Sequence, residues 1–377
     1  MSGHAGSSAV PHAVTAVAAL RWQARSCAGS SPLYGALLAR LADDADAGGP
    51  TAAVLEGHDD DSRGSALGLR LMAALHRAVL ERRAPRLALH YPSVGGDGDA
   101  DLAWPAVRDL LAEQPEQVRA DLDRPCQTNE PGRAAALLLG LLHVARTRGR
   151  QRLRLLEIGA SAGLNLRVDA YRIGALGPPD SPCRLVDPWE GPAPAATAYQ
   201  LVERRGCDPA PVDATSAEGR LALTSSVWAD QPARFGRLRG ALAVAASVPA
   251  VVDRAGAAAW LRGRLAEPQP AGVVTVVWHS IVRQYVEAAE WADVEAQLAA
   301  AGPSVEHLAM EPEPHEAIPV TVGGVRIAVA GPHGPPVRAL APPSPSAATA
   351  SATAPPRARP RPVIRPRPVP RDPPRAP

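Results

Sequence analysis

The segment Glu157-Ile-Gly-Ala-Ser-Ala-Gly163 brings an acid, a hydroxyl and two glycines together within one short stretch. Glu157 stands near the end of the apolar run Leu153–Ile158, and the first glycine follows this run at once. This order predicts a strand, a tight turn and then a helix that continues to about Tyr171. Small residues in such a turn let a ligand approach the backbone where the helix begins. The segment is therefore typical of a nucleotide- or nucleoside-binding turn.

The residues 159–163 also fit the G-x-S-x-G nucleophile elbow, in which Ser161 would attack an acyl carbon. That chemistry needs an acid and then a histidine later in the chain, and Glu311 and His333 follow in this order. A hydrolase serine, however, comes after several strands of its sheet, and only Leu87–Tyr91 is a strand candidate before residue 153. The sequence therefore favours the ligand-binding turn and leaves a serine hydrolase as the alternative.

A polar run, Gln127-Thr-Asn-Glu130, precedes a strongly apolar helix. Side chains of this kind cap the first turn of a helix, and they also bind ligands there. Arg133 lies one turn into the helix, where its guanidinium can hold a carboxylate. We therefore predict a substrate site formed by Gln127, Asn129, Glu130 and Arg133.

Two more candidates stand where predicted strands end, at the sheet edge where α/β enzymes bind ligands. His279 follows the apolar run Val273–Trp278 and is the candidate general base. Asp208, with Asp187 as the alternative, would end the second strand, where an acid can hold ribose hydroxyls. No group of His, Cys, Asp and Glu has metal-ligand spacing, so no metal is expected.

The candidates are positioned by three predicted parts of the chain. Residues 1–150 read mainly as helices, while residues 151–340 alternate strands and helices and end in a β-hairpin around Gly323-Gly324. This alternation predicts an α/β domain with a mostly parallel sheet. Residues 341–377 contain 13 prolines and seven arginines, which predicts a disordered tail.

Composition excludes several classes of function. The 377 residues carry 40 basic and 38 acidic side chains, a balance that argues against a dedicated nucleic-acid binder. Every basic residue is arginine, so Schiff-base and P-loop lysine chemistry are excluded. No apolar run is long enough to span a membrane, and the four cysteines have no CxxC spacing. We therefore expect a cytoplasmic protein that binds a small molecule. The oligomeric state stays open.

The turn at 157–163 resembles motif I of class I S-adenosylmethionine-dependent methyltransferases, acid-x-Gly-x-Gly-x-Gly, with a serine in place of the central glycine. The resemblance implies a Rossmann-like sheet, a helical region before its first strand, and methyl transfer to a small acceptor. It implies S-adenosylmethionine binding by Glu157, Gly159, Ser161, Gly163, Asn165 and Asp208. A ligand-binding module without catalysis is a third hypothesis.

Several short segments, taken in order, are similar to the bacterial domain-of-unknown-function family 2332, found mostly in actinobacteria. They are Ser31–Tyr34, Gln127–Arg133, Glu157–Asn165, Trp228–Gln231 with Arg234 and Arg237-Leu238, His279, and Pro332–Gly334. The chain departs from the family pattern at Pro131, where valine is more usual, and at Cys207 and Pro209. The resemblance covers about residues 15 to 338. It implies that this stretch is one unit, and it supplies no activity.

Overall fold

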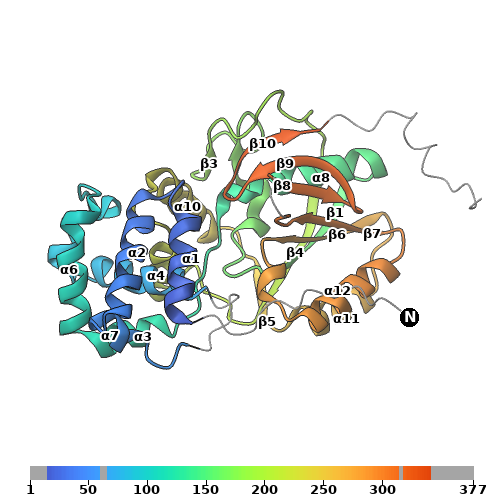
Figure 1. Ribbon diagram of the computed structural model, residues 1–377. Coiled ribbons are helices and arrows are strands. Elements are labelled where there is room, and N and C mark those ends of the chain that lie inside the picture. The colour runs from blue at the N-terminus through green and yellow to red at the C-terminus, as the bar shows by residue number, and fades with distance from the viewer. Residues whose placement is uncertain (1–14, 60–65, 314–316, 341–377) are drawn as a thin grey trace, which may run out of the picture. The chain divides into compact units, whose positions relative to one another are not determined.

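The computed structural model describes residues 15–59, 66–313 and 317–340 (Figure 1). These residues belong to one compact unit that ends at Leu340. The disordered tail predicted for residues 341–377 lies outside the described residues. None of the described helices is long and apolar enough to cross a membrane.

In the described residues before the first strand the regular elements are helices, as the sequence predicts. Ser31 and Pro32 open the second helix, because the Ser31 hydroxyl accepts a hydrogen bond of 3.2 Å from the amide of Tyr34. The helices are α1 (Ala16–Cys27), α2 (Pro32–Asp46), α3 (Pro50–Leu55), α4 (Leu67–Leu80), α5 (Pro85–Ala88), α6 (Ala100–Glu113), α7 (Pro115–Leu122) and α8 (Ala134–Arg148), with short 3-10 turns η2 (Pro92–Val94) and η3 (Pro131–Arg133).

The first seven helices share one apolar core, whereas α8 belongs to the core of the sheet. The side chains of Leu71 and Leu75 in α4 are fully buried in the first core, as their helical spacing predicts. In α8 almost every apolar residue is buried, which is typical of a helix covered on all sides. The α8 helix therefore joins the helical part to the sheet.

The main sheet has the strand order β10-β9-β8-β7-β6-β1-β4-β5. Every pairing from β5 through β7 is parallel, and β7 to β10 form an antiparallel series. The strands are β1 (Arg152–Ile158), β4 (Gln200–Asp208), β5 (Val251–Arg254), β6 (Val273–Ser280), β7 (Val305–Met310), β8 (Ile318–Val322), β9 (Val325–Gly331) and β10 (Gly334–Ala339). The chain therefore has an α/β fold with a mostly parallel sheet.

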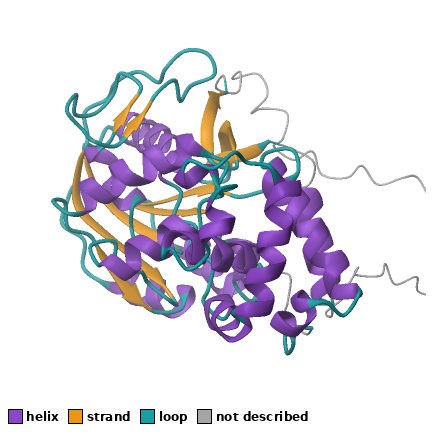
Figure 2. Cartoon of the chain, turned by 90° about the vertical axis from the view of Figure 1, so that its left-hand side faces the viewer, coloured by secondary structure: helices purple, strands orange, loops and turns teal. Residues whose placement is uncertain are grey.

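Helices cover both faces of this sheet (Figures 1 and 2). One face packs against α8 and α10 (Pro232–Ala245), and the other packs against α11 (Ala257–Ala266) and α12 (Ala288–Ala300). The remaining elements are α9 (Ala217–Ser225), the 3-10 turns η4 (Asn165–Ala170) and η5 (Arg283–Tyr285), and a separate two-stranded sheet of β2 (Arg172–Ile173) and β3 (Arg184–Leu185). Covered on both faces, β1 is buried from Leu153 to Ile158.

Several predicted elements were wrong in detail. Leu87–Tyr91 is not a strand, because Pro85 opens the short helix α5 there. The helix predicted after the turn is the six-residue 3-10 helix η4, which has non-helical backbone angles at Arg167. Strand β5 was missed, since Val251–Arg254 is short and has no alternating pattern. Strand β10 was missed because its prolines argue against a strand, although it lies at a sheet edge where proline is tolerated.

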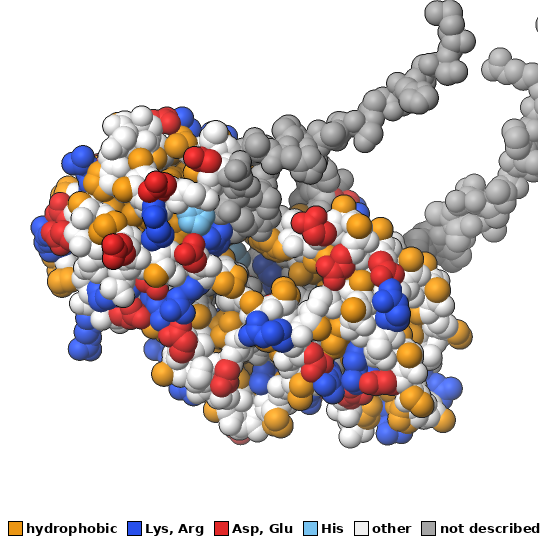
Figure 3. All heavy atoms as spheres, turned by 90° about the horizontal axis from the view of Figure 1, so that it is seen from below, with side chains coloured by type: hydrophobic (Ala, Val, Ile, Leu, Met, Phe, Trp, Pro, Cys, Tyr) orange, Lys and Arg blue, Asp and Glu red, His pale blue; other side chains and the backbone are white. Residues whose placement is uncertain are grey.

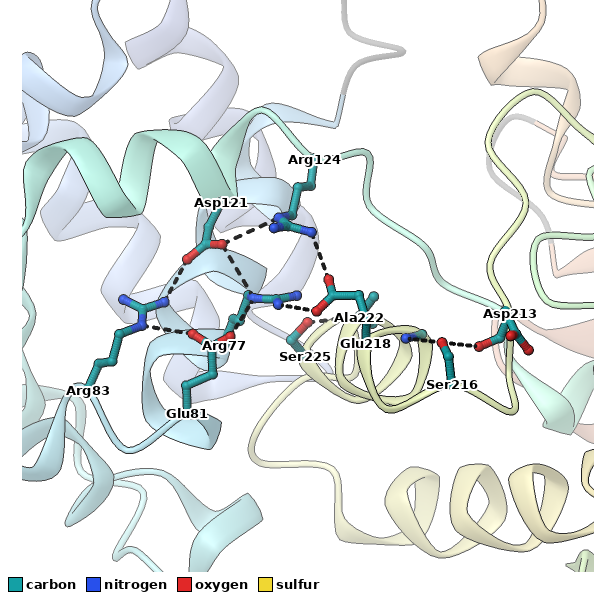
Figure 4. A network of polar contacts seen from close by, with 11 residues as sticks. Arg77, Glu81, Arg83, Asp121, Arg124, Asp213, Ser216, Glu218, Ala222 and Ser225 are labelled. Carbon is teal, nitrogen blue, oxygen red and sulfur yellow. Dashed lines mark hydrogen bonds and ion pairs between the residues drawn. The ribbon is translucent and has the colours of Figure 1, made fainter.

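An ion-pair network fastens the first helices to the rest of the molecule (Figure 4). Arg77 on α4 lies 2.6 Å from a carboxylate oxygen of Glu218 on α9, and Arg124 lies 2.7 Å from the other. Asp121 on α7 contacts Arg77, Arg83 and Arg124 from the opposite side. Because Arg77 is buried, these contacts tie α4, α7 and α9 into one rigid group.

Charges on the visible surface are mixed in sign. In the view from below, arginine and acidic side chains are interspersed over the described surface (Figure 3). This face has no continuous basic stripe of the kind that tracks a nucleic-acid backbone.

Candidate functional site

The turn after β1 has a strained backbone that small residues make possible. Gly159, Ser161 and Gly163 all have positive φ, at 70°, 51° and 64°. A Cβ on Gly159 would come within 2.3 Å of the Val282 side chain, and positive φ is costly for other residues. The turn therefore needs glycine at position 159 for both reasons, whereas Ser161 tolerates its backbone strain.

The backbone amides of this turn bind other parts of the protein. The amide of Ala160 donates to the carbonyl of Cys207 at 2.9 Å, and that of Ser161 donates to the carboxylate of Asp208 at 2.9 Å. The amide of Leu164 donates to the side-chain oxygen of Asn129 at 2.8 Å. These bonds hold the turn against β4 and the 127–130 segment, so its shape is fixed in advance of any ligand.

The predicted substrate residues Gln127 and Asn129 therefore lie against the predicted cofactor turn. The hydroxyl of Ser161 donates a hydrogen bond to the side-chain oxygen of Gln127, whose amide nitrogen donates to the carbonyl of Ala210 at 3.0 Å. Both side chains are buried. Gln127 thus links the turn after β1 to the loop after β4.

Glu130 is placed differently from the prediction, because it binds two arginines of α10. Its carboxylate lies 2.5 Å from Nε of Arg234 and 3.3 Å from Nε of Arg237, and it also caps η3 through the amide of Gly132 at 2.9 Å. Burial acts to raise the pKa of Glu130, but the two guanidinium groups outweigh it and hold the pKa below its ordinary value. Both carboxylate oxygens thus bind groups of the protein, and Glu130 does not line the pocket described below.

Glu157, at the end of β1, is a buried acid with an uncompensated oxygen. Its side chain is 2 % exposed, and Oε2 has no hydrogen-bond partner among the described residues. Burial raises the pKa of Glu157 to about 8, against the lowering effects of Trp278 and Arg133. A cation placed near this carboxyl would favour its ionised form.

A pocket of about 440 Å³ opens beside the turn, within the usual size range of small-molecule sites. The loops after the neighbouring strands β1, β4 and β6 line it with Gly159, Ser161, Asp208, Pro209, Ala210 and Ser280–Val282. The remaining wall comes from Ala66, Leu69, Arg70, Asp123, the residues 125–128, Arg133, Tyr285 and Val286. The pocket thus lies at the carboxyl edge of the parallel strands, between the sheet and the first helices.

Asp208 is the acid that ends the strand next to β1. Its two carboxylate oxygens accept backbone hydrogen bonds of 2.9 Å from Ser161 and 2.8 Å from Ala210, and its pKa is raised by burial. Each oxygen keeps a second lone pair, so Asp208 can still accept hydrogen bonds from a ligand in the pocket. The alternative, Asp187, lies outside every strand.

Arg133 brings an unpaired positive charge to the pocket. Its guanidinium donates to the carbonyl oxygens of Ser280 at 3.2 Å and Pro332 at 3.3 Å, and it forms no ion pair with any residue in the described ranges. Burial lowers the pKa of Arg133, and Arg234 adds to this effect. Since Glu130 is taken by Arg234 and Arg237, Arg133 is free to hold a ligand carboxylate.

His279 lies at the end of β6 as predicted, but neither ring nitrogen is free. Nδ1 lies 2.7 Å from Oε1 of Glu311, and Nε2 lies 2.7 Å from Nε2 of His307. His279 is 1 % exposed and packs edge-on against Trp291. It does not line the pocket, although Ser280–Val282, which follow it, do.

The three residues of the hydrolase alternative are engaged elsewhere. Ser161 bonds Gln127, Glu311 bonds His279, and His333 packs edge-on against Trp228 at 5.8 Å between ring centroids. No hydrogen bond joins Ser161, Glu311 and His333 within the described part of the chain. Ser161 shares with a nucleophile elbow its G-x-S-x-G sequence, its place in a turn after a strand and its positive φ, but not the catalytic partners.

Asn165 lies at the start of η4, buried at 1 % exposure, with its side-chain oxygen unpartnered among the described residues. Sequence reasoning missed Tyr285, which lines the pocket, and His307, which contacts His279. Tyr285 lies in the short turn η5 and belongs to no motif, and His307 lies inside the strand β7. No local signal marks either residue.

The short segments that suggested a family lie together in space. Ser31 donates to Asp230 at 2.7 Å, and Tyr34 stacks on Trp228. Glu130 binds Arg234 and Arg237 of the same region, while Arg133 contacts the carbonyl of Pro332. Together with the bonds from Gln127 and Asn129 to the turn, these contacts form one connected framework beside the pocket.

Comparison with known proteins gives one match. The model of a family described as an uncharacterized protein conserved in bacteria (DUF2332) matches residues 17–341. No curated protein and no solved structure matches the chain significantly.

Proposed function

Because the chain belongs to the uncharacterized bacterial family DUF2332, we propose its function from the pocket itself: it is a methyltransferase-like protein that binds S-adenosylmethionine and methylates a small acceptor. The observation that carries the proposal is the position of the pocket. It lies where the loops after β1, β4 and β6 meet, with the turn 159–163 and Asp208 in its wall.

The order of the parallel strands supports this proposal. Numbered along the chain, these strands β5-β4-β1-β6-β7 have the order 3-2-1-4-5, which is the order of Rossmann-type sheets. The order reverses between β1 and β6, and ligands of such sheets bind outside the carboxyl ends at that point. The antiparallel strands β8 to β10 continue the sheet beyond this core.

The charges beside the pocket suit a ligand that carries both signs. Arg133 lines the pocket and is a cation without a carboxylate partner in the described structure. Glu157 is not among the lining residues, but it is a buried acid with an uncompensated oxygen at the end of β1. The amino-acid end of S-adenosylmethionine has a carboxylate for the first and an ammonium group for the second. Asp208 would accept hydrogen bonds from the ribose hydroxyls. These residues fit the proposed ligand.

S-adenosylmethionine supplies a methyl group on a sulfonium ion, so the protein needs mainly to position the acceptor and to exclude water. The side chains of Leu69 and Val282 and the ring of Tyr285 give the pocket wall an apolar part. The framework from Gln127 and Asn129 keeps the turn in place while ligands exchange. Asn129 and Glu130 therefore position the site, whereas Gln127 and Arg133 are the members of the predicted substrate set that line the pocket.

Isothermal titration of the full-length chain with S-adenosylmethionine and S-adenosylhomocysteine tests the proposal. We expect micromolar binding of both ligands, weakened about tenfold or more by Asp208→Asn, since a hydrogen bond to a charged group is lost. Asp213→Asn is the matched control. Asp213 also accepts backbone and side-chain hydrogen bonds in a turn, but it lies outside the pocket.

Two results would decide against the proposal. Absence of binding by a folded protein at millimolar ligand would remove it, and equal losses in both aspartate variants would show that Asp208 acts only through the turn. Release of S-adenosylhomocysteine during incubation with cell extract separates a transferase from the alternative of a non-catalytic binding module. Tight binding of S-adenosylmethionine with no release of S-adenosylhomocysteine in any fraction of the cell extract would favour the non-catalytic binding module.

A further inference from the structure

A chain of three polar side chains runs behind the pocket wall. Glu311, His279 and His307 are joined by two contacts of 2.7 Å, one between Oε1 and Nδ1 and one between the two Nε2 atoms. The imidazole rings of His279 and His307 are stacked, with centroids 5.0 Å apart. Trp291 on α12 packs edge-on against His279 and covers it. His279 lies at the end of β6, His307 lies inside β7, and Glu311 directly follows β7.

The contact between the two Nε2 atoms fixes the protonation of the whole chain. A bond between two ring nitrogens needs one proton, so one nitrogen donates and the other accepts. With Glu311 ionised, His279 donates from Nδ1 and accepts at Nε2, and His307 then donates from Nε2. Burial lowers the pKa of His307 to about 4, and His279 adds to this effect, so a neutral His307 agrees with this arrangement. Nδ1 of His307 carries no proton in this state.

One added proton leaves both hydrogen bonds in place. If a proton arrives at Nδ1 of His307, the proton on its Nε2 moves to Nε2 of His279. The proton on Nδ1 of His279 then moves to Glu311. The carboxylic acid now donates to Nδ1 of His279, and Nε2 of His279 donates to His307. Both bonds keep their atoms and exchange donor and acceptor, and the net charge rises from −1 to 0.

The carboxylate end of this chain holds the wall of the pocket. Glu311 accepts hydrogen bonds from the amides of Val282 at 3.0 Å and Arg283 at 3.4 Å, and Val282 lines the pocket. The negative charge of Glu311 also acts to raise the pKa of Arg133 and that of Tyr285, and both of these residues line the pocket. On the α12 side, Arg283 lies 3.5 Å from Glu295, which bonds the indole of Trp291.

We propose that Glu311, His279 and His307 form a proton relay that takes up or releases one proton for the chemistry of the pocket. This role rests on the proposed function, because alkylation of a neutral acceptor releases a proton that must leave the site. Glu311 is the end nearest the pocket, and His307, half-buried in β7, is the outer end. His279 acts through its neighbours and is a positioning residue.

Nitrogen-15 NMR of histidine-labelled protein tests the relay without any ligand. At high pH we expect His279 protonated at Nδ1 and His307 at Nε2. As the pH falls, both rings should change to the opposite tautomer at one common midpoint. His76 is the internal control, since it is buried and bonds Ser93 and a backbone carbonyl outside the relay.

Two variants distinguish proton transfer along the relay from a purely structural role of its residues. His307→Gln keeps a donor toward His279 but cannot pass a proton on, so His279 should keep its Nδ1 tautomer at every pH. Glu311→Gln removes the group that takes the proton from Nδ1 of His279, so the joint tautomer change of the two rings should be lost. Tautomers that stay fixed in the wild-type protein, or an imidazolium that forms at His307 alone, would overturn the relay.

Ligand affinities test the link to the pocket. The sulfonium charge of S-adenosylmethionine favours the anionic relay, whereas S-adenosylhomocysteine lacks that charge. As the pH falls through the midpoint that the NMR experiment gives for the relay, the preference for S-adenosylmethionine over S-adenosylhomocysteine should fall by about three- to tenfold, because the relay takes up its proton. In the Glu311→Gln variant this preference should not change with pH. If the tautomers change but the preference for S-adenosylmethionine stays constant, the link between relay and pocket is overturned. If neither ligand binds, the proposed function is overturned, and the NMR result alone decides whether the relay exists.

Discussion

The hydroxyl of Ser161 donates a hydrogen bond to the side-chain oxygen of Gln127, and both side chains are buried. The bond joins the two segments whose chemistry stands out most in the sequence. It gives Ser161 a structural partner where a hydrolase would need a histidine. The same contact helps to explain why a serine replaces the glycine of the methyltransferase-like pattern, since glycine has no hydroxyl to donate.

Ser161 should therefore be inert toward acyl-transfer probes. We expect no labelling of the wild-type chain by a fluorophosphonate, because no base lies within hydrogen-bond distance of the hydroxyl in the described structure. Mass spectrometry of the treated protein provides the measurement. Stoichiometric labelling that disappears in Ser161→Ala would restore the hydrolase alternative.

Gly159→Ala should be strongly destabilising. Its Cβ would lie 2.3 Å from the Val282 side chain in a backbone conformation with φ of 70°, so we expect a loss of about 2–4 kcal/mol in the free energy of unfolding. Gly236→Ala is the control, since Gly236 lies in α10 with open space around its Cβ position. That variant should be unchanged or more stable by about 0.5–1 kcal/mol. If urea denaturation gave the same change in the free energy of unfolding for Gly159→Ala and Gly236→Ala, the turn would not require glycine at position 159.

Glu157→Gln should stabilise the ligand-free protein and weaken ligand binding. A carboxyl whose pKa is raised from 4.5 to about 8 is protonated in the folded chain and ionised in the unfolded chain between these values, so the wild type loses stability as the pH rises through this window. At pH 8 we expect the variant to be more stable by about 1–3 kcal/mol, and at pH 4 to match the wild type. Urea denaturation at both pH values provides the test, and a less stable variant at pH 8 would contradict it.

Much of the sheet could be predicted because buried parallel strands are continuous apolar runs. The predictions for β1, β6 and the β8–β9 hairpin were confirmed within a few residues. Strand β5 was not predicted, since its four residues are stabilised by pairing with β4 rather than by their own pattern. Tertiary pairing of this kind leaves no local trace in the sequence.

The site was harder to predict, because side-chain types do not reveal their partners. Gln127 and Glu130 stand in one polar run, yet one bonds the turn and the other bonds Arg234. The contact of His279 with His307 depends on the register of β6 and β7, which places Val277 opposite His307. Register is set by packing across the whole sheet, so spacing along the chain cannot give it.

Arg133→Gln should weaken only ligands that carry a carboxylate. We expect about tenfold or greater losses for S-adenosylmethionine and S-adenosylhomocysteine, because a charge-assisted bond is removed, and little change for 5′-methylthioadenosine, which lacks the amino-acid end. Arg184→Gln is the control, since Arg184 is exposed and donates to the backbone carbonyl of Pro179, which lies outside the pocket wall. An equal loss for all three ligands would show that Arg133 shapes the pocket through Ser280 and Pro332 instead.

Glu130→Gln should destabilise the protein more than any surface charge change. The carboxylate is 2 % exposed and faces Arg234, which is also buried, so the substitution leaves buried guanidinium charge without its partner, at a cost of about 3–5 kcal/mol. Glu56→Gln, which removes a mostly exposed partner of Arg119, should cost less than about 1 kcal/mol.

The pH dependence and a double variant identify the cause of this loss. Since the pKa of Glu130 is lowered in the folded state, its stabilising effect is present above the ordinary value of 4.5 and is lost as the pH falls through the folded value. The difference in the free energy of unfolding between the wild type and Glu130→Gln should therefore become smaller at acidic pH. Adding Arg234→Gln to Glu130→Gln should recover part of the stability, because no buried charge then faces an amide. A double variant less stable than the sum of the two single losses would place the stabilising interaction elsewhere in the framework.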